Sequence, residues 1–303
     1  MSLLVFSGSV EQGLIYGLVA LALLVSYRVL DIADLTVDGS FTLGAGASAM
    51  LVLAGHPLLG LLVAPLAGAL AGVVTALLQT KCKVAPILAG IITMTALYSI
   101  NLMVMGGRSN LQLLRTETVF TAVRALLGDS AGPLVLLAAV DVVVCTLLGL
   151  FLRTRTGLAV RATGDNPAMV RASSINPAVT TLIGLAIANA LVGLAGGLIA
   201  QYQQFTEVGG GTGTVVLGLA SLIIGEVITG RSSMPRRLAG AIVGAIVYRL
   251  ILALALSASV TPQNLKLVSA IIVAAAISAP AIKQRVQLAQ KKRKAVREHA
   301  ARH

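Results

Sequence analysis

Long apolar runs separated by short polar connections dominate the sequence. A helix needs about 20 mostly apolar residues to cross the hydrocarbon core of a membrane. About nine runs reach or approach that length, and they occupy residues 11–30, 39–54, 58–80, 84–105, 133–152, 177–200, 213–229, 238–256 and 265–282. The pattern predicts an all-α polytopic membrane protein with about nine transmembrane helices.

Lys and Arg in the connections predict the orientation of these helices, because basic residues are enriched on the cytoplasmic side. The connections that contain Lys or Arg are 81–83, 153–176, 231–237 and the C-terminal end, whereas 56–57, 201–212 and 257–264 contain neither. We therefore expect a cytoplasmic C-terminus and an external N-terminus. The connection 106–132 departs from the rule, because it contains three Arg residues although this topology makes it external.

Three carboxylates interrupt the apolar pattern between the first two runs, at Asp31, Asp34 and Asp38. The run that follows has only about fifteen residues, which is too short to cross a membrane alone. A broken second helix fits this pattern, and irregular backbone at membrane depth tends to line a pathway. The alternative is an ordinary cytoplasmic loop between two complete helices. On the first interpretation, the residues of the translocation pathway are Asp34, Thr36, Asp38, Gly39 and Ser40.

A faint internal similarity links residues 36–44 with residues 213–221. In the predicted topology the first segment runs outward and the second runs inward. Paired segments of opposite direction are typical of inverted-repeat transporters. Gly-rich apolar segments also resemble one another by chance, so both explanations remain open.

The segment 153–176 is too polar to span the membrane and too long for a tight turn. Its pattern predicts two short surface helices. Asp165 or Asn166 can cap the second one, and Pro167 fits its first turn, where a missing N–H has no consequence. Its apolar side consists of Ala168, Met169, Ala172 and Ile175. Such a helix can lie on the lipid surface or dock on a partner protein.

Composition agrees with a fold that lies in lipid. The chain is 57% hydrophobic and 11% charged, whereas soluble domains carry roughly a quarter charged residues. The net charge is +12, and the tail 283–303 holds eight of the Lys and Arg residues against one acid. This divides the chain into a transmembrane domain, residues 1–282, and a basic cytoplasmic tail. Anionic membrane lipid, rather than nucleic acid, is the expected partner of that tail.

The residues that carry most metal and catalytic chemistry are few and scattered. Cys82 follows a Lys in a basic connection and Cys145 lies in an apolar run, so neither a disulfide nor a metal site is expected. The three His residues lie in a connection and in the tail. This distribution offers no metal-ligand or Ser/His group, and we do not expect an enzyme.

Three charged residues lie inside predicted spans, and such residues usually face the interior of a bundle. They are Asp141, Glu226 and Arg249. We expect Arg249 to form an ion pair between helices with Asp141 or Glu226, with contact to the substrate or a gate as the alternative. Asn101 and Asn189 are expected to form hydrogen bonds between helices.

The segment 153–176 resembles the cytoplasmic coupling segment of ABC importer permeases in the branched-chain amino acid and ribose permease family. The similar positions are Gly157, Arg161, Ala162, Gly164, Asn166, Pro167, Ala172, Ile175 and Asn176. Residues 30–46 resemble the broken second helix of that family. The sequence DLTVDGSF within them resembles a subgroup associated with tryptophan or tyrosine uptake. Ser174 departs from the family, which usually has Gly there.

The resemblance implies a permease subunit in the bacterial cytoplasmic membrane. Its partners would be a second permease subunit, two cytoplasmic ATP-binding subunits and an extracytoplasmic substrate-binding protein. ATP would be bound and hydrolysed by another chain, since this one has no Gly-rich phosphate loop and needs no cofactor itself. Coupling to the ATPase would involve Gly157, Arg161, Ala162, Gly164, Asp165, Asn166 and Ala172.

The same resemblance favours an aromatic amino acid as substrate, with a branched-chain amino acid or another small metabolite as the alternative. A homodimer is expected, and its interface would use small-residue faces such as Gly193, Gly196 and Gly197, unless these pack within the subunit. An ion-coupled secondary transporter is the other class of function, because the Asp31, Asp34 and Asp38 cluster could serve a coupling ion.

Overall fold

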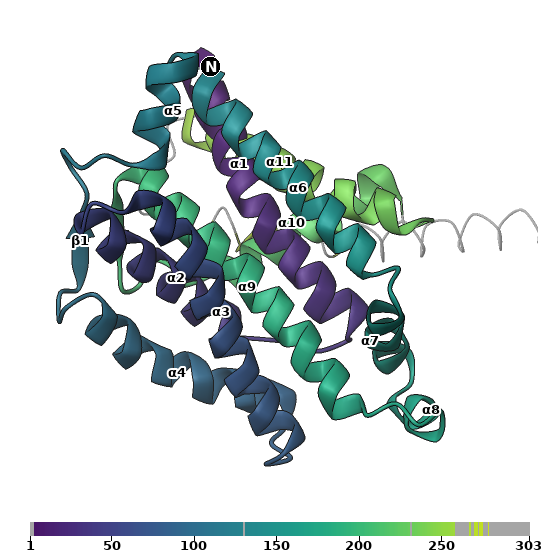
Figure 1. The fold of residues 1–303 in the computed structure, drawn as a ribbon. Helices are drawn as coiled ribbons and strands as arrows, with labels where there is room; N and C mark the ends of the chain where they lie inside the picture. Colours follow the sequence, from purple (N-terminus) through teal and green to yellow (C-terminus); the bar gives the residue numbers. More distant parts are fainter. Residues whose placement is uncertain are drawn as a thin grey trace, which may run out of the picture.

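The computed structural model describes residues 3–257 except 130 and 231, together with residues 267, 270, 271, 273, 274 and 278. Most of the described chain is helical (Figure 1). The α-helices are α1 (Leu3–Leu23), α2 (Thr36–Leu53), α3 (Pro57–Thr80), α4 (Pro86–Val104), α5 (Val119–Leu127), α6 (Ala131–Phe151), α7 (Arg155–Asp165), α8 (Pro167–Ala172), α9 (Pro177–Gln203), α10 (Thr214–Thr229) and α11 (Met234–Ser257). A π-helical segment, η1 (Leu24–Val29), continues α1, and two short strands are β1 (Asn110–Gln112) and β2 (Phe205–Glu207).

Seven of the described helices are long and apolar enough to cross a membrane, with α1 and η1 counted as one. The shorter apolar helix α10 corresponds to the seventh predicted run. The first eight predicted runs therefore lie on helices, and a polytopic helical fold is confirmed. The ninth predicted span, 265–282, and the tail 283–303 lie outside the described residues apart from isolated positions of the span.

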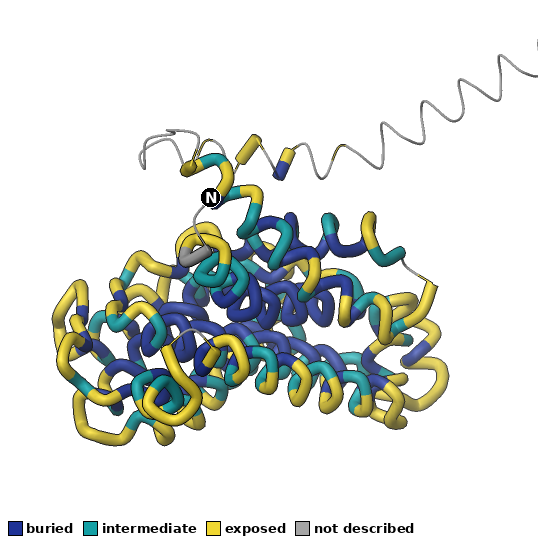
Figure 2. The backbone as a smooth tube through the Cα atoms, turned by 90° about the horizontal axis from the view of Figure 1, so that it is seen from above, coloured by how far each residue is buried: buried dark blue, intermediate teal, exposed yellow. Residues whose placement is uncertain are grey.

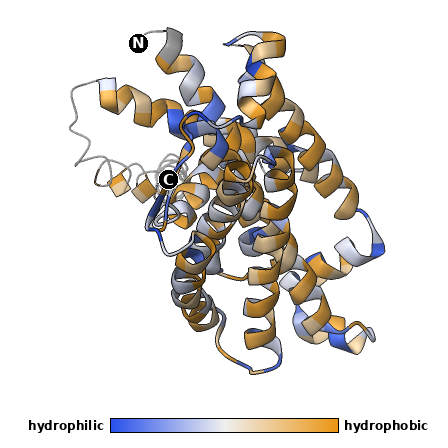
Figure 3. Cartoon of the chain, turned by 60° about the vertical axis from the view of Figure 1, so that its left-hand side comes forward, coloured by the Kyte–Doolittle hydropathy of each residue, from blue (hydrophilic) through white to orange (hydrophobic). Residues whose placement is uncertain are grey.

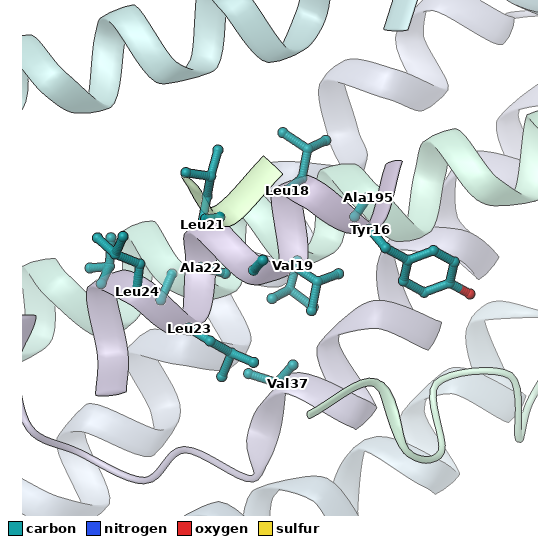
Figure 4. Packing of buried hydrophobic residues seen from close by; sticks show 14 of the residues in the cluster. Tyr16, Leu18, Val19, Leu21, Ala22, Leu23, Leu24, Val37 and Ala195 are labelled. Carbon is teal, nitrogen blue, oxygen red and sulfur yellow. The ribbon is translucent and has the colours of Figure 1, made fainter. Parts of the chain in front are cut away.

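The centre of the bundle is formed by α1 and α9. A helix that is apolar on every side is a core helix, and Leu18 to Val25 are all buried. Buried residues occupy the middle of the molecule and exposed ones its rim (Figure 2). In the close view, Leu23 of α1 points toward Val37 of α2 (Figure 4). The first helix of the chain therefore serves as a packing surface for its neighbours.

Glycine brings α2, α3 and α9 into close contact. A Cβ added at Gly44 would collide with the backbone of Gly193, and one added at Gly193 would collide with the Ala64 carbonyl. Gly196 and Gly197 face α2 and α3 in the same way. Of the two roles considered for Gly193, Gly196 and Gly197, the structure shows the packing within the subunit, because their faces are filled by α2 and α3.

The outer faces of several helices are apolar as well. Leu62, Leu66 and Leu70 form an exposed stripe on α3, and many other large hydrophobic residues of the helices are exposed. Hydrophobic residues make up most of the helices, and hydrophilic residues lie mainly near helix ends and connections (Figure 3). An apolar exterior of this extent is typical of a surface that faces lipid or another membrane subunit.

The two strands join connections that are distant in the sequence. β1 pairs antiparallel with β2, with Asn110 opposite Glu207. The connections 106–132 and 201–212 therefore lie at the same end of the bundle, as the predicted topology requires. Helix α5 is part of the first connection and has a capping box formed by Thr118 and Thr121. The helices α7 and α8 lie at the lower right, away from β1 on the left (Figure 1).

Candidate functional site

The polar interruption after α1 forms a non-helical segment. The chain leaves η1 at Leu30, and Asp31 adopts a positive φ of 56°. Residues 30–35 have no regular structure until α2 begins at Thr36. Asp31 and Ala33 are exposed, whereas Asp34 is only 2% exposed. The three carboxylates of this region therefore lie in different environments, and only Asp34 is enclosed by protein.

The start of α2 lies beside the middle of α9. Asn189 donates a hydrogen bond of 2.7 Å from Nδ2 to Asp34 Oδ2 and accepts one of 2.7 Å at Oδ1 from Ser40 Oγ. Asn189 lies about twelve residues into α9, or about 18 Å along it at 1.5 Å per residue. Because α9 has 27 residues, α2 begins next to its central part and not at either end.

Asp34 is the centre of a buried hydrogen-bond network. Its Oδ1 accepts from the Thr36 backbone N–H at 2.9 Å, which satisfies one of the free donors at the start of α2. The hydroxyls of Thr36 and Thr75 lie 2.7 Å apart, so the network reaches α3. Hydrogen bonds to a charged group contribute about 1.5 to 3 kcal/mol each. The arrangement joins α2, α3 and α9 around one carboxylate, and it confirms the expected interhelical role of Asn189.

Asp38, in the first turn of α2, bonds to the start of another helix, α10. Its Oδ1 accepts from Val215 N at 2.9 Å and from Thr214 Oγ1 at 2.8 Å, and its Oδ2 accepts from Gly213 N at 2.9 Å. The carboxylate therefore lies at the N-terminus of α10, where the helix dipole stabilises negative charge. Gly213 has a φ of 92°, which only glycine adopts readily. The two segments of the faint internal similarity thus begin two helices whose N-termini meet.

The other two residues predicted for the pathway are buried in helix contacts. Gly39 packs against Leu97 of α4, and its carbonyl accepts a hydrogen bond of 3.2 Å from Asn101 Nδ2. This confirms the expected interhelical hydrogen bond of Asn101. Ser40 is bonded to Asn189, as described above. Asp34, Thr36, Asp38, Gly39 and Ser40 therefore come together at the start of α2, with Asp38 the most exposed of the five.

A small cavity of about 130 Å³ lies next to this region. Its lining includes Tyr16, Phe41 and Thr42, together with Phe205 and Glu207 of β2. The rings of Tyr16 and Phe41 are stacked, with their centroids 5.9 Å apart. Thr42 also accepts a hydrogen bond from Gly211 N at 3.0 Å. Aromatic and polar groups thus share one cavity within a helical turn of Asp38.

The expected partners of Arg249 are wrong. Its guanidinium lies 4.0 Å from the centroid of the Tyr16 ring, a cation–π contact. Glu226 instead forms an ion pair of 2.6 Å with Arg28. Asp141 is buried, and its Oδ2 has no hydrogen-bond partner among the described residues.

Arg249 lies at a different depth in the bundle from Glu226 and Asp141, and so it pairs with neither of them. Gly225, next to Glu226, packs against Gly240, and Arg249 lies about nine residues farther along α11, or about 14 Å. Asp141 lines a cavity with Ile242, about two turns before Arg249. Arg28 was missed because it lies near the end of an apolar run, although an Arg in such a run is itself a signal. Glu11 was also missed, because it is the first residue of the same apolar run. It accepts a hydrogen bond of 2.7 Å from Tyr202 Oη.

The polar segment 153–176 forms the two short helices that its sequence predicts. Thr154 caps α7 through a hydrogen bond from Gly157 N, and Asn166 Oδ1 caps α8 by accepting from Ala168 N and Met169 N. Pro167 is the first residue of α8, as expected. Of the two candidate caps, Asn166 is therefore the one used, and Asp165 ends α7.

The helix α7 packs beneath the ends of α1 and α9. The hydroxyls of Thr163 and Thr180 lie 2.7 Å apart, and a Cβ added at Gly164 would collide with the Val29 carbonyl. On α8 the apolar side is exposed, and Met169 is 69% exposed. Of the residues expected to couple to an ATPase, Gly157 is buried, Ala162 and Gly164 are half-buried, and the exposed ones are Arg161, Asp165, Asn166 and Ala172.

These features define a polytopic helical membrane protein with a short helix pair at one end of its bundle. The chain belongs to the family described as branched-chain amino acid transport system / permease component, whose model matches residues 5–277. The resemblance inferred from the sequence is thereby confirmed. The chain is thus a permease component of an amino acid transport family. A permease of this family is a transport component and not a catalytic one.

The chain is also similar to individual known proteins, to two of them over most of its length. It is 37% identical over 265 residues to the tyrosine transport system permease protein of Clostridioides difficile, covering 87% of each chain. It is 30% identical over 276 residues to an uncharacterized protein of Rickettsia prowazekii, covering 89% of this chain and 95% of the other. It is 29% identical to the probable branched-chain amino acid transport permease protein LivH of Methanocaldococcus jannaschii over 113 residues, covering 36% and 33%. No solved structure matches the chain.

Proposed function

We propose that this chain is the transmembrane permease subunit of a binding-protein-dependent ABC importer in the bacterial cytoplasmic membrane. It would act with a second permease subunit, two cytoplasmic ATP-binding subunits and an extracytoplasmic substrate-binding protein. Membership of the permease family supports this proposal. The observation that carries it is the exposed helix α8, whose uncovered apolar side is joined through α7 to the interior of the bundle.

The connection between α8 and the interior is continuous. α8 follows α7 directly, and α7 contacts η1 through Gly164 and α9 through the Thr163 and Thr180 hydroxyls. α9 carries Asn189, which holds Asp34 at the start of α2. A displacement of α7 by an ATPase subunit would therefore act directly on the elements that position the segment 30–35. In this proposal the whole segment 153–176 serves as the coupling region.

The broken second helix and the pathway belong to the same proposal. Because α2 starts beside the middle of α9, we infer that its N-terminus lies within the membrane and that α2 and α10 are the two interrupted helices of an inverted repeat. Asp34, Thr36, Asp38, Gly39 and Ser40 would border the translocation pathway at that depth. Asp38 would act at the surface of the pathway, whereas Asp34 would hold the start of α2 against α9.

The substrate is proposed to be an amino acid, with an aromatic one favoured. The tyrosine transport permease of Clostridioides difficile supports an aromatic side chain, and so does the cavity lined by Tyr16 and Phe41 beside Asp38. The amino group of a zwitterion could meet the Asp38 carboxylate, and a helix N-terminus could receive its carboxylate. A branched-chain amino acid or another small metabolite is the alternative.

The orientation and the dimer complete the proposal. The end that carries α7 and α8 would face the cytoplasm, together with the C-terminus, and the end that carries β1 and β2 would face outward. Since Gly193, Gly196 and Gly197 are occupied within the subunit, a homodimer would use other, exposed apolar faces of the bundle. The mass of the purified complex tests this, and one copy beside a different permease chain would exclude the homodimer.

The coupling role can be tested with Met169→Asp in proteoliposomes that contain the complete importer. A charge buried without a partner at a protein contact costs roughly 3 kcal/mol, which is more than tenfold in affinity. We expect ATP-driven uptake and co-purification of the ATPase to fall at least tenfold. Met103→Asp is the matched control, because Met103 is 75% exposed on α4, near the opposite end of the bundle.

The same experiment separates the proposal from an ion-coupled secondary transporter. Uptake by the purified chain alone, driven by an ion gradient and unaffected by Met169→Asp, would support the secondary transporter. Unchanged ATP-driven uptake and unchanged ATPase co-purification in Met169→Asp would show that α8 is not the docking helix.

A further inference from the structure

A cavity of about 660 Å³ opens between α6 and α11, over the surface of α1. Both helices pack on α1, but they contact each other sparsely. The lining is mainly apolar, and it includes Leu14 of α1, Val142 and Leu150 of α6, and Leu238 and Ile242 of α11. A groove of this kind on the side of a membrane-spanning bundle is open to the acyl chains of lipid.

One end of the cavity is basic. Arg153, two residues after the end of α6, and Arg161 of α7 are both lining residues, and both are exposed. Neither guanidinium makes a hydrogen bond or an ion pair within the part of the chain that the structure describes. Pro235 lines the same end, and Arg236 follows it at the start of α11. The cavity thus combines an apolar groove with unneutralised positive charge at the end where α6 leaves the bundle.

We propose that this cavity binds one anionic phospholipid. Its phosphate would lie between Arg153 and Arg161, since guanidinium groups bind phosphate through paired N–H donors. One acyl chain would run along the groove toward the middle of α6. Basic pockets between membrane helices bind anionic headgroups in this way. The inference requires only that α6 and α11 span the membrane, and it does not depend on the substrate or on the proposed coupling role.

The length of the groove agrees with one lipid leaflet. Asp141 lies about twelve residues before Arg153, or about 18 Å along α6, which is on the order of half the 30 Å hydrocarbon core. A chain that enters beside Arg153 would therefore end near Asp141. An acyl chain offers the Asp141 carboxyl group no hydrogen bond, so Asp141 marks the far end of the site and takes no part in binding.

The test uses the fact that the chain contains no Trp. Leu150→Trp places a single fluorophore in the groove next to the arginines, and Leu70→Trp places one on the exposed stripe of α3. The purified protein is reconstituted in phosphatidylcholine with increasing brominated phosphatidylglycerol or brominated phosphatidylcholine, and Trp quenching is measured. Val142→Trp, in the same cavity, repeats the measurement if Leu150→Trp does not fold.

We expect each arginine to contribute a preference of roughly fivefold for the anionic lipid, the ratio implied by about 1 kcal/mol near a charged surface, so that the two together give on the order of 30-fold at the groove fluorophore. The α3 fluorophore should show a ratio near one. Arg153→Gln or Arg161→Gln should lower the groove ratio at least twofold, whereas Arg155→Gln, on an exposed residue that does not line the cavity, should leave it unchanged.

Three results would overturn the proposal. Equal ratios at the two fluorophores would show that the groove has no headgroup preference. Absence of quenching by either lipid at Leu150→Trp would mean that protein covers the groove, as a second copy of the chain would. Loss of the preference on addition of inorganic phosphate would assign the arginines to a free anion. Each readout is lipid contact, so failure of the coupling role of Arg161 would not affect it.

Discussion

The network around Asp34 leads to a quantitative prediction about stability. Asp34→Ala removes the acceptor for the Thr36 backbone N–H and for the Asn189 side-chain amide, which are both buried. A buried donor without a partner costs about 1 to 3 kcal/mol, so the two together cost roughly 2 to 6 kcal/mol. For a chain of this size, 1 kcal/mol lowers the melting temperature by about 2 to 4 °C. We therefore expect Asp34→Ala to lower it by on the order of 10 °C.

A second substitution tests the hydrogen-bond argument itself. Asp34→Asn keeps an oxygen acceptor for Thr36, and rotation of the Asn189 amide by 180° would restore a bond between the two side chains. Asn189 would then lose its bond to the Leu185 carbonyl, which is 3.0 Å long, and a neutral hydrogen bond contributes about 1 kcal/mol. Asp34→Asn should consequently lower the melting temperature by only about a third as much as Asp34→Ala.

The assay is the loss of the monodisperse peak in size-exclusion chromatography after heating of detergent-solubilised protein. Asp31→Asn is the matched control, because Asp31 is exposed and Asn tolerates its positive φ; no change is expected. A melting temperature for Asp34→Ala within about 2 °C of the wild type, which is less than 1 kcal/mol, would refute the structural role. If transport were then lost, Asp34 would instead act on the substrate.

Two further predictions concern the polar contacts that join distant elements. Asp38→Ala removes the acceptor of two backbone N–H groups and a hydroxyl at the start of α10. Loss of a helix cap costs about 1 to 2 kcal/mol, so the melting temperature should fall. Transport should fall more than substrate capture by the binding protein. Unchanged transport in this variant would remove Asp38 from the pathway. Gln201→Leu breaks bonds to Ser48, to the Pro57 carbonyl and to Val119 N, and with about 1 kcal/mol per bond it should destabilise the protein by roughly 3 kcal/mol, as measured by thermal denaturation. The exposed Gln203→Leu is its control, and equal melting temperatures for the two variants would contradict the burial argument.

Local sequence determined the class of this protein, its helices and its short helix pair. The apolar runs predict the membrane helices because the length of a span depends only on the thickness of the hydrocarbon core. The sequence also predicted the helix pair α7 and α8, because Asn166 and Pro167 act on backbone groups within a few residues of themselves. The family could also be inferred at this level, since its resemblance rests on residues that are close together in the chain.

Tertiary structure decided which polar residues meet. Asp34 and Asn189 are 155 positions apart, and Arg28 and Glu226 are 198 apart. Such contacts depend on the depth of each helix and on its rotation about its own axis, and an apolar run specifies neither when residues on every side are apolar. For this reason the partner predicted for Arg249 was wrong, and the sequence left open whether the glycines of α9 pack within the subunit or at a dimer interface. The same limit applies to the cavity between α6 and α11, which exists because two helices that are distant in the sequence pack on α1 and only sparsely on each other.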